Sequence, residues 1–387
     1  MQIIPYGRQT IDDADIEAVV RILRSDFLTQ GPEVPRFEKV IAEYCGAQFG
    51  VAVNSATSAL HIACMALGLG PGDVAWTTPN TFVASANCAR YCGADVDFVD
   101  IDPLTYNLCP QKLLDKLKLA EASGCLPKVV IPVHFSGLPC DMVAIHALSQ
   151  QYGFRIIEDA SHAIGASYQG EKVGNCRYSD ITVFSFHPVK IITTAEGGLA
   201  TTQSADLAEK MQDYRSHGIT RDSVRLHNHT EGAWYYEQQS LGFNYRMTEM
   251  QAALGLSQSR NLDAWIDKRH QIADTYDKQL SRLPLILPKR QAQSRSALHL
   301  YVVQVDDSRT SKSRREVFDA LRELGIGVNV HYIPVHLQPD YKRLGFTSGQ
   351  FPVSEAYYAR CISLPMFLGL DNASLQTVIR ALHKIFD

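Results

Sequence analysis

The feature that most constrains the fold of this chain is a regular alternation of two kinds of segment through most of its first half. Residues 49–54 (FGVAVN), 128–135 (KVVIPVHF) and 180–186 (DITVFSF) are short and rich in valine, isoleucine and phenylalanine, as buried strands are. Between them, segments such as 55–69 and 142–153 have the length and apolar spacing of helices. This order predicts an α/β fold with a mostly parallel central sheet and helices on both faces.

The later part of the chain has a different organisation. A long helical pattern begins near Thr248, and the composition changes after it, at Pro284. A second, shorter set of strand-like and helix-like segments follows, which is typical of a separate small domain. The length of 387 residues suits two domains. We therefore predict a large domain at residues 1–260, which begins with an arm at residues 1–25, and a smaller C-terminal α/β domain at residues 261–387.

Charge and composition exclude several classes of partner. The net charge is −4 and no basic block occurs, so we expect neither a nucleic-acid nor a membrane partner. We find no signal peptide, and no apolar run approaches the roughly 18 residues that a membrane span needs. Nine cysteines are scattered without CxxC pairs, which indicates reduced thiols in a cytoplasmic protein. The thirteen histidines lack metal-ligand spacing, so no metal site is predicted.

Several chemically active residues fall at strand ends, where open parallel sheets bind ligands. The segment after residues 49–54 opens a helix with small polar residues. The free backbone N–H groups of its first turn, at Ala56 and Thr57, could bind an anion with help from the helix dipole. Ordinary capping of the helix by Ser55 or Thr57 is the alternative interpretation.

A second strand end carries acids and a histidine. Asp159 ends the apolar segment RIIED, and its carboxylate could hold a protonated ring nitrogen. His162 lies three residues further on and could reach the same ligand. A helix cap or solvated turn would equally explain Asp159, and a structural histidine would equally explain His162.

A third strand end carries a lysine. Lys190 follows residues 180–186, and it is either a surface cation or a buried amine with a lowered pKa that forms an imine with an aldehyde. Pyridoxal 5'-phosphate (PLP) requires such a lysine, an acid at its ring nitrogen and a phosphate site. Lys190, Asp159 and the Ala56–Thr57 turn with Ser185 supply all three. Phe82, at another strand end, could stack on the ring, although core packing would also explain it. The joint occurrence predicts a PLP site.

These residues lie in a long ordered series of motifs. They include LTQGPEVPRFE, VNSATSALHIA, IIEDASHAIGA, FSFHPVK, GFNYRMTEMQAALGLSQ and VHYIPVH. In this series the chain resembles the sugar-nucleotide aminotransferases of the DegT/DnrJ/EryC1/StrS family, within the fold-type I (aspartate aminotransferase-like) PLP enzymes. The resemblance covers nearly the whole chain. One departure is Ile191, where proline is expected after the lysine.

The resemblance implies a role for each site residue. It makes Lys190 the Schiff-base lysine, Asp159 the partner of the pyridinium nitrogen, His162 a neighbour of the ring hydroxyl and Phe82 the stacking residue. The phosphate would be bound by Ala56, Thr57 and Ser185, and by Asn244 from a neighbouring subunit, which implies a homodimer with shared sites. The sugar nucleotide would be contacted by Tyr6, Asp26, Phe27, Leu28, Thr29, His331, Tyr332, Ile333 and Pro334.

The resemblance also implies a reaction. L-glutamate would supply an amino group to C4 of a UDP-4-keto-6-deoxy-N-acetyl-hexosamine, as in pseudaminic acid biosynthesis. Another 4-keto or 3-keto sugar nucleotide, or a non-catalytic regulator that binds PLP or sugar, are the alternatives. Family members that act as dehydratases have histidine in place of the lysine, so Lys190 argues against that activity. A nicotinamide-dependent dehydrogenase is disfavoured because no GxGxxG follows a strand.

Overall fold

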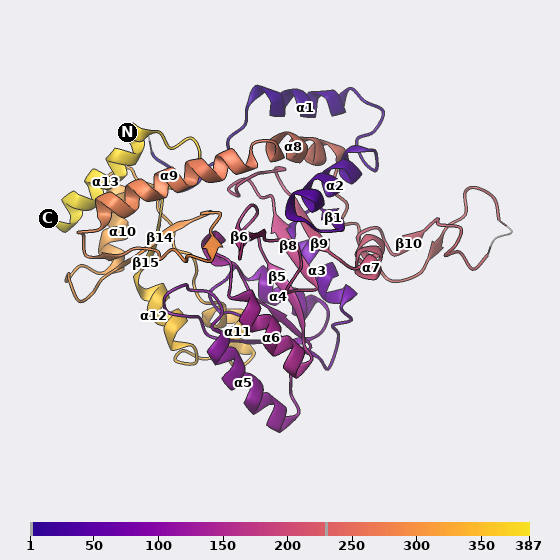
Figure 1. The fold of residues 1–387 in the computed structure, drawn as a ribbon, viewed down its shortest axis with the longest axis horizontal. Coiled ribbons are helices and arrows are strands. Elements are labelled where there is room, and N and C mark those ends of the chain that lie inside the picture. Colours follow the sequence, from indigo (N-terminus) through magenta and orange to yellow (C-terminus); the bar gives the residue numbers. More distant parts are fainter. Residues whose placement is uncertain (1–2, 229–230) are drawn as a thin grey trace.

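Seven strands form the central sheet of the protein, which a computed structural model describes at residues 3–228 and 231–387 (Figure 1). In spatial order the strands are β1 (Phe49–Val53), β9 (Gly198–Thr202), β8 (Ile181–Ser185), β5 (Arg155–Asp159), β4 (Val129–Ile131), β2 (Val74–Thr77) and β3 (Asp95–Phe98). β9 runs antiparallel to both of its neighbours, while β8, β5, β4, β2 and β3 pair in parallel. The predicted mostly parallel sheet is confirmed.

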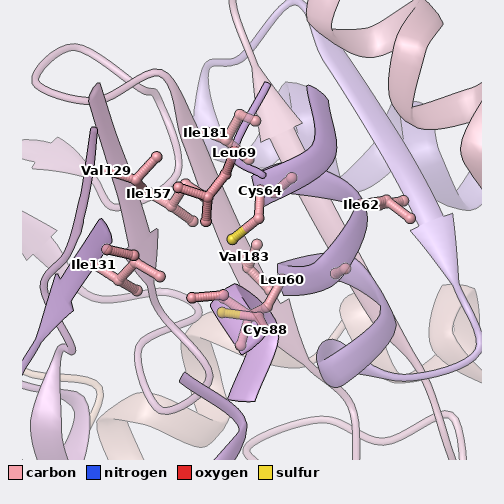
Figure 2. Close-up of a cluster of buried hydrophobic side chains, with 14 of the residues drawn as sticks. Leu60, Ile62, Cys64, Leu69, Cys88, Val129, Ile131, Ile157, Ile181 and Val183 are labelled. Carbon is pink, nitrogen blue, oxygen red and sulfur yellow. The ribbon is translucent and has the colours of Figure 1, made fainter. Parts of the chain in front are cut away.

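Helices cover both faces of this sheet, because both sets of alternating side chains along the strands are apolar. Ile157 of β5 packs with the helices of one face, and its neighbour Ile156 packs with those of the other. Figure 2 shows the first of these cores, in which Leu60 and Cys64 meet residues of β8, β5 and β4. Each such fully buried aliphatic side chain stabilises the fold by about 1.5–3 kcal/mol. The helices of the large part are α1 (Asp13–Leu23), α2 (Glu33–Cys45), α3 (Ala56–Ala66), α4 (Ala84–Tyr91), α5 (Pro110–Ser123), α6 (Met142–Tyr152), α7 (Ala205–Arg215) and α8 (Glu249–Ser259).

The helix starts are fixed by local side-chain caps. In α8, Thr248 accepts a hydrogen bond from the backbone of Gln251, whose side chain accepts one from the backbone of Thr248. In α3, the Ser55 hydroxyl accepts from the backbone N–H of Ser58. The capping interpretation of Ser55 is therefore correct, and it leaves the preceding N–H groups of α3 available.

A smaller antiparallel sheet lies in the C-terminal part, which is at the left of Figure 1. Its strands, in order, are β12 (Leu285–Ile286), β14 (Tyr301–Val305) and β15 (Cys361–Leu364), and the helices packed with it are α9 (Leu262–Leu280), α10 (Arg314–Glu323) and α13 (Asn372–Phe386). The long helix α9 belongs to two cores: Ile266 is buried with the large part, and Tyr276 with the small one. A domain boundary at residue 261 stays a prediction.

The segment after the loop that contains His331 returns to the large part. It comprises η2 (Val335–Leu337), α11 (Pro339–Arg343) and α12 (Pro352–Arg360). Val335 and Tyr341 are buried in the same core as α3 and α4. The Asp100 carboxylate accepts hydrogen bonds from the backbone N–H groups of Val353 and Ser354, each at 2.9 Å. These contacts fix the loop 329–334 over the ends of the parallel strands.

Two short ladders lie outside the main sheets. β13 (Ser294–Arg295), β6 (Ser167–Tyr168) and β7 (Glu171–Lys172) form a three-stranded sheet. β10 (Ile219–Thr220) pairs with β11 (Glu237–Gln238) at the base of an arm that projects from the body (Figure 1). The arm carries Val224 and Trp234, which are 87% and 75% exposed. None of the described helices combines the length and the apolar character that a membrane crossing requires.

Candidate active site

A cavity of about 540 Å³ lies at the carboxyl ends of the parallel strands. Four segments that follow strands contribute to its wall: Ser55–Thr57 after β1, Thr81–Ser85 after β2, Asp159–His162 at β5 and Ser185–Lys190 at β8. Parallel strands end at one edge of the sheet, so residues far apart in the chain meet there. The structure thus brings together the three strand ends that the sequence singled out.

Lys190 lies on the loop that connects β8 to β9, with its side chain in this cavity. The loop is closed by a hydrogen bond from the backbone N–H of Phe186 to the carbonyl of Gly197, at 2.9 Å. Ile191 and Ile192 are 3% and 0% exposed and anchor the loop in the core beside α2 and α8. The departure from the family pattern at Ile191 therefore adds buried apolar surface directly after the lysine.

The electrostatics of Lys190 suit a nucleophilic amine. Burial lowers its pKa to about 8, and the nearby Asp159 carboxylate opposes this shift. A substantial fraction of the amine is therefore neutral near physiological pH, unlike the amine of a surface lysine. The place of Lys190 in the cavity wall favours this interpretation over that of an ordinary surface cation.

Asp159 is a buried carboxylate held on both of its oxygens. Its Oδ2 accepts a hydrogen bond from the Ser85 hydroxyl at 2.6 Å, and its Oδ1 accepts one from the backbone N–H of Ser161 at 3.0 Å. The side chain is 5% exposed. No lysine, arginine or histidine among the described residues forms an ion pair with it, so its charge is available to a cation placed in the cavity.

Glu158, next to Asp159, serves a different purpose because successive residues of a strand point to opposite faces. Its carboxylate bonds His134 at 2.7 Å and Ser179 at 2.5 Å, away from the cavity. Burial opposes protonation of His134, but contacts with Cys140 and Glu158 prevail and raise the His134 pKa to about 10. The pair of His134 and Glu158 therefore stabilises β5 and takes no part in the cavity.

The start of α3 forms a cradle for an anion. Ala56 and Thr57 line the cavity at the amino end of the helix, and Ser185 lines the same cavity. Gly198 of β9 makes this possible, since a Cβ added there would lie 2.5 Å from the backbone nitrogen of Ala56. The N-terminal amides of a helix and a hydroxyl are the groups that bind phosphate in proteins.

His162 lies deep in the cavity and forms part of an aromatic cluster. Its Nε2 shares a 3.1 Å hydrogen bond with the Tyr332 hydroxyl, and its ring lies 4.4 Å from that of His299. Burial, then the charges of Lys190 and His331, hold its pKa well below the usual value, so the ring is neutral. Its Nδ1 has no hydrogen-bond partner among the described residues. A buried nitrogen of this kind is expected to find a partner in a bound ligand.

Three further predicted residues line the mouth of the cavity. Phe82 is 59% exposed there, with its ring 6.4 Å from that of Tyr332. Tyr6 reaches the cavity because its segment pairs with the C-terminal part, where its carbonyl accepts from Met366. His331 lies 5.7 Å from the Tyr6 ring and shares a 2.7 Å hydrogen bond with Ser363. Burial and the charge of Lys190 lower the pKa of His331 to about 4.

The remaining predicted residues do not line the cavity of their own chain. Asp26, Phe27, Leu28 and Thr29 lie in the turn after α1, where Leu28 accepts a hydrogen bond from the backbone of Glu249. Asn244 is exposed at the base of the arm. Ile333 is 47% exposed, and Pro334 is buried behind the loop. The roles assigned to these residues, like those of the residues inside the cavity, stay predictions.

Sequence reasoning missed Ser85 and His299. Ser85 lies in a helix start that gave no sign of its contact with Asp159. His299 stands beside β14, between two leucines, and enters the cavity wall only through the packing of the two parts of the chain. The buried Arg269 fixes it by donating to the carbonyls of Leu298 and His299, at 3.2 and 3.3 Å. The two leucines beside His299 in the sequence gave no sign that this histidine lines a site.

This geometry agrees with a comparison of the whole chain with known families. The model of one family, described as the DegT/DnrJ/EryC1/StrS aminotransferase family, matches residues 9–383. The chain belongs to the DegT/DnrJ/EryC1/StrS family. It is therefore a PLP-dependent sugar aminotransferase, as the sequence motifs predicted.

Individual members of the DegT/DnrJ/EryC1/StrS family match over their full length. Spore coat polysaccharide biosynthesis protein SpsC of Bacillus subtilis is 40% identical over 385 residues, which cover 99% of this chain and 97% of that protein. UDP-4-amino-4,6-dideoxy-N-acetyl-beta-L-altrosamine transaminase of Campylobacter jejuni is 37% identical over 388 residues, which cover 99% of this chain and 98% of that protein.

Solved structures of the DegT/DnrJ/EryC1/StrS family confirm the fold-type I architecture. Helicobacter pylori PseC, an aminotransferase involved in the biosynthesis of pseudoaminic acid, has a TM-score of 0.91 at 30% identity, covering 100% of this chain and 99% of that one. Spr1654 of Streptococcus pneumoniae in its PLP-form has a TM-score of 0.87 at 28% identity, covering 100% of both chains.

The residues present fit the PLP that the family uses. The cavity offers an amine of lowered pKa at Lys190, a carboxylate at Asp159 and an unpartnered ring nitrogen at His162. The α3 cradle, kept open by Gly198, matches the phosphate of the cofactor. Among the described residues, no cluster of three or more histidine, cysteine, aspartate or glutamate side chains is arranged to hold a metal ion.

Proposed function

We propose that this aminotransferase moves an amino group from L-glutamate to C4 of a UDP-4-keto-6-deoxy-N-acetyl-hexosamine, in a pathway to pseudaminic acid. The observation that carries the transamination is the half-buried Lys190 amine, which lies in one cavity with Asp159 and the α3 cradle. The substrate is supported by similarity to the Campylobacter jejuni altrosamine transaminase and to Helicobacter pylori PseC.

Each residue of the site has a part in this reaction. Bound PLP supplies an electron sink for the carbon that loses a proton. The Lys190 amine, neutral in part near pH 8, accepts that proton and returns it. Asp159, fixed by Ser85 and Ser161, holds a proton on the ring nitrogen. The hydrogen bond between Tyr332 and His162 fixes the His162 ring, whose unpartnered Nδ1 would be available to the hydroxyl of the cofactor ring.

The wide mouth of the cavity suits a sugar nucleotide. Tyr6 and His331 come from segments outside the central sheet, so they can shape the sugar site without disturbing the cofactor site. A low pKa keeps His331 neutral, and a neutral imidazole can both donate to and accept from sugar hydroxyls.

The working unit we propose is a homodimer in which each cavity is completed by the partner. Two observations support this. The segment Asp26–Thr29 and Asn244 are exposed outside the cavity of their own chain, and the arm at residues 219–228 and 231–238 projects from the body with Val224 and Trp234 in solvent. Large apolar side chains on a projecting arm are typical of an interface. Asn244 of one chain would then reach the phosphate in the other. We also propose that residues 1–260 form the large domain of each chain and residues 261–387 the small one.

A second candidate is an aminotransferase for a different 4-keto or 3-keto sugar nucleotide. The 40% identity to SpsC, a spore coat polysaccharide protein, favours it. A non-catalytic regulator is a weaker alternative, because the amine, the acid and the phosphate cradle are all in place.

Product analysis separates these candidates. The purified holoenzyme is incubated with L-glutamate and a panel of 4-keto-6-deoxy and 3-keto-6-deoxy sugar nucleotides that differ at C2 and C5. The proposal requires 2-oxoglutarate and a 4-amino sugar from the N-acetylated UDP sugar at the highest kcat/KM. Preference for another ketosugar establishes the second candidate. An absorbance spectrum that glutamate leaves unchanged would indicate a regulator.

A further inference from the structure

A second cavity, of about 170 Å³, lies between the two parts of the chain. Residues 104–106 and 136–138 form one side, and residues of α9 and of the segment 288–301 form the other. None of the residues that line it lines the active-site cavity. Junctions between domains are frequent places for ligand sites.

Strained backbone is concentrated around this second cavity. Eight described non-glycine residues have positive φ, and three of them line it: Tyr106 at 62°, Ser136 at 56° and Leu298 at 50°. Positive φ is uncommon for tyrosine and leucine, and such residues gather at ligand sites and switches. The turn at Gly137 is tightly packed here, since a Cβ added to it would lie 2.9 Å from the backbone nitrogen of Leu298.

Three consecutive residues, 298–300, line both cavities in alternation. Leu298 and Leu300 line the second cavity, while His299 between them lines the active site. The His299 ring lies 4.4 Å from that of His162. A ligand in the second cavity would therefore contact both chain neighbours of an active-site histidine.

The lining combines an apolar body with polar and cationic groups and one carboxylate, Asp277, which pairs with Arg290 and accepts a hydrogen bond from the Tyr301 hydroxyl. Leu138, Leu298, Leu300 and Tyr301 supply the apolar part, and a cavity of about 150 Å³ accommodates a benzene ring. The Ser294 hydroxyl is buried without a hydrogen-bond partner among the described residues.

Three cations surround the mouth of the second cavity. Arg290 pairs with Asp274 and Asp277, and Arg295 pairs with Asp267. Lys289 is exposed and forms no ion pair with any described residue. Burial, with the charges of Arg295 and Arg290, lowers the pKa of His270 in the wall, so that ring adds no charge. Lys289 and the unpartnered Ser294 hydroxyl therefore line the same cavity.

We propose that this cavity binds a small aromatic carboxylate. Its ring lies among Leu138, Leu298 and Leu300, and its carboxylate lies between Lys289 and the Ser294 hydroxyl. Occupancy acts on catalysis through the segment Leu298–Leu300, because movement of the leucines moves His299. The binding does not depend on which sugar nucleotide the enzyme uses.

Binding is tested with benzoate on holoenzyme whose PLP has been fixed to Lys190 by borohydride, which blocks the active site. Calorimetry should give one saturable site per chain with a millimolar Kd. Benzamide, which has the ring without the charge, and the Lys289→Glu variant should each weaken binding about tenfold. Lys118→Glu, an exposed lysine on α5, is the matched control and should leave benzoate binding unchanged.

Two measurements decide the place and the consequence of binding. A crystal of the holoenzyme with 4-bromobenzoate should place bromine beside Leu298 and Leu300. Benzoate should change kcat without competing with glutamate, and Lys289→Glu should abolish that change. The proposal is overturned if benzoate does not saturate, if Lys289→Glu binds it as wild type does, if inorganic phosphate displaces it equally well, or if bromine lies only in the active site.

Discussion

The Ser85 hydroxyl lies 2.6 Å from Oδ2 of Asp159 and donates a hydrogen bond to it, which joins the start of α4 to the end of β5. The same hydroxyl lies 2.7 Å from Thr81. Asp159 therefore keeps one orientation before any ligand arrives. Preorganised groups of this kind lower the cost of reaching the transition state.

Removal of the Ser85 hydroxyl should lower activity with little effect on the fold. A hydrogen bond to a charged group contributes about 1.5–3 kcal/mol, so Ser85→Ala should reduce kcat about 10- to 100-fold. The pKa of the bound cofactor's ring nitrogen, followed by absorbance against pH, should fall in the variant, because Asp159 is less well placed. Ser149→Ala removes another buried hydroxyl, on α6, and should leave both quantities unchanged. Wild-type kcat in Ser85→Ala would contradict a positioning role.

Incorporation of PLP into the apoenzyme should depend on pH with a midpoint of about 8. Burial lowers the Lys190 pKa to about 8, and only the neutral amine, which dominates above that pH, attacks an aldehyde. Asp159→Asn should move the midpoint down, because the carboxylate raises this pKa. Stopped-flow absorbance measures the rate, and Lys190→Ala should give no covalent adduct. A midpoint near the ordinary lysine value of about 10.4 would show that the amine is solvated.

The buried pair of His134 and Glu158 should make stability depend on pH. Its contacts raise the His134 pKa from about 6.5 to about 10, so the stabilisation from that contact is complete below pH 6.5 and is lost as pH rises to 10. The contact lowers the Glu158 pKa against the effect of burial, so its stabilisation is lost in acid. Glu158→Gln should cost about 3–5 kcal/mol at pH 6 and less at pH 10, as measured by urea unfolding. A pH-independent difference would contradict the coupling.

Asn244 should act in the cavity of the partner. Asn244→Asp places a carboxylate near the cofactor phosphate and should weaken PLP binding, since like charges repel. Mixed with Lys190→Ala, it should restore activity, because one of the two sites in each mixed dimer has both native residues. Random pairing predicts about a quarter of wild-type activity. Activity no higher than the sum of the two variants alone would place Asn244 in its own chain's site or outside any site.

The sequence pattern was sufficient to predict the mostly parallel sheet and its helices, because the spacing of apolar residues distinguishes strands from helices locally. The antiparallel direction of β9 was not predictable, because it depends on how the loop with Lys190 returns, which is set by packing of Ile191 and Ile192. Asp159 was identifiable from its place at a strand end. Its partner Ser85 and the wall residue His299 were not, because their roles arise from contacts between segments distant in sequence. The role proposed for Asn244 involves a second chain, so the structure of one chain does not test it.

The 19-residue helix α9 runs from one apolar core into the other without interruption. Unfolding of either part would expose α9 side chains buried in that core and remove support from the rest of the helix. The halves of the molecule are thereby tied to one melting event despite having separate sheets. Scanning calorimetry should accordingly record a single peak, whose calorimetric and van't Hoff enthalpies agree, and two resolved peaks would show that the shared helix breaks first.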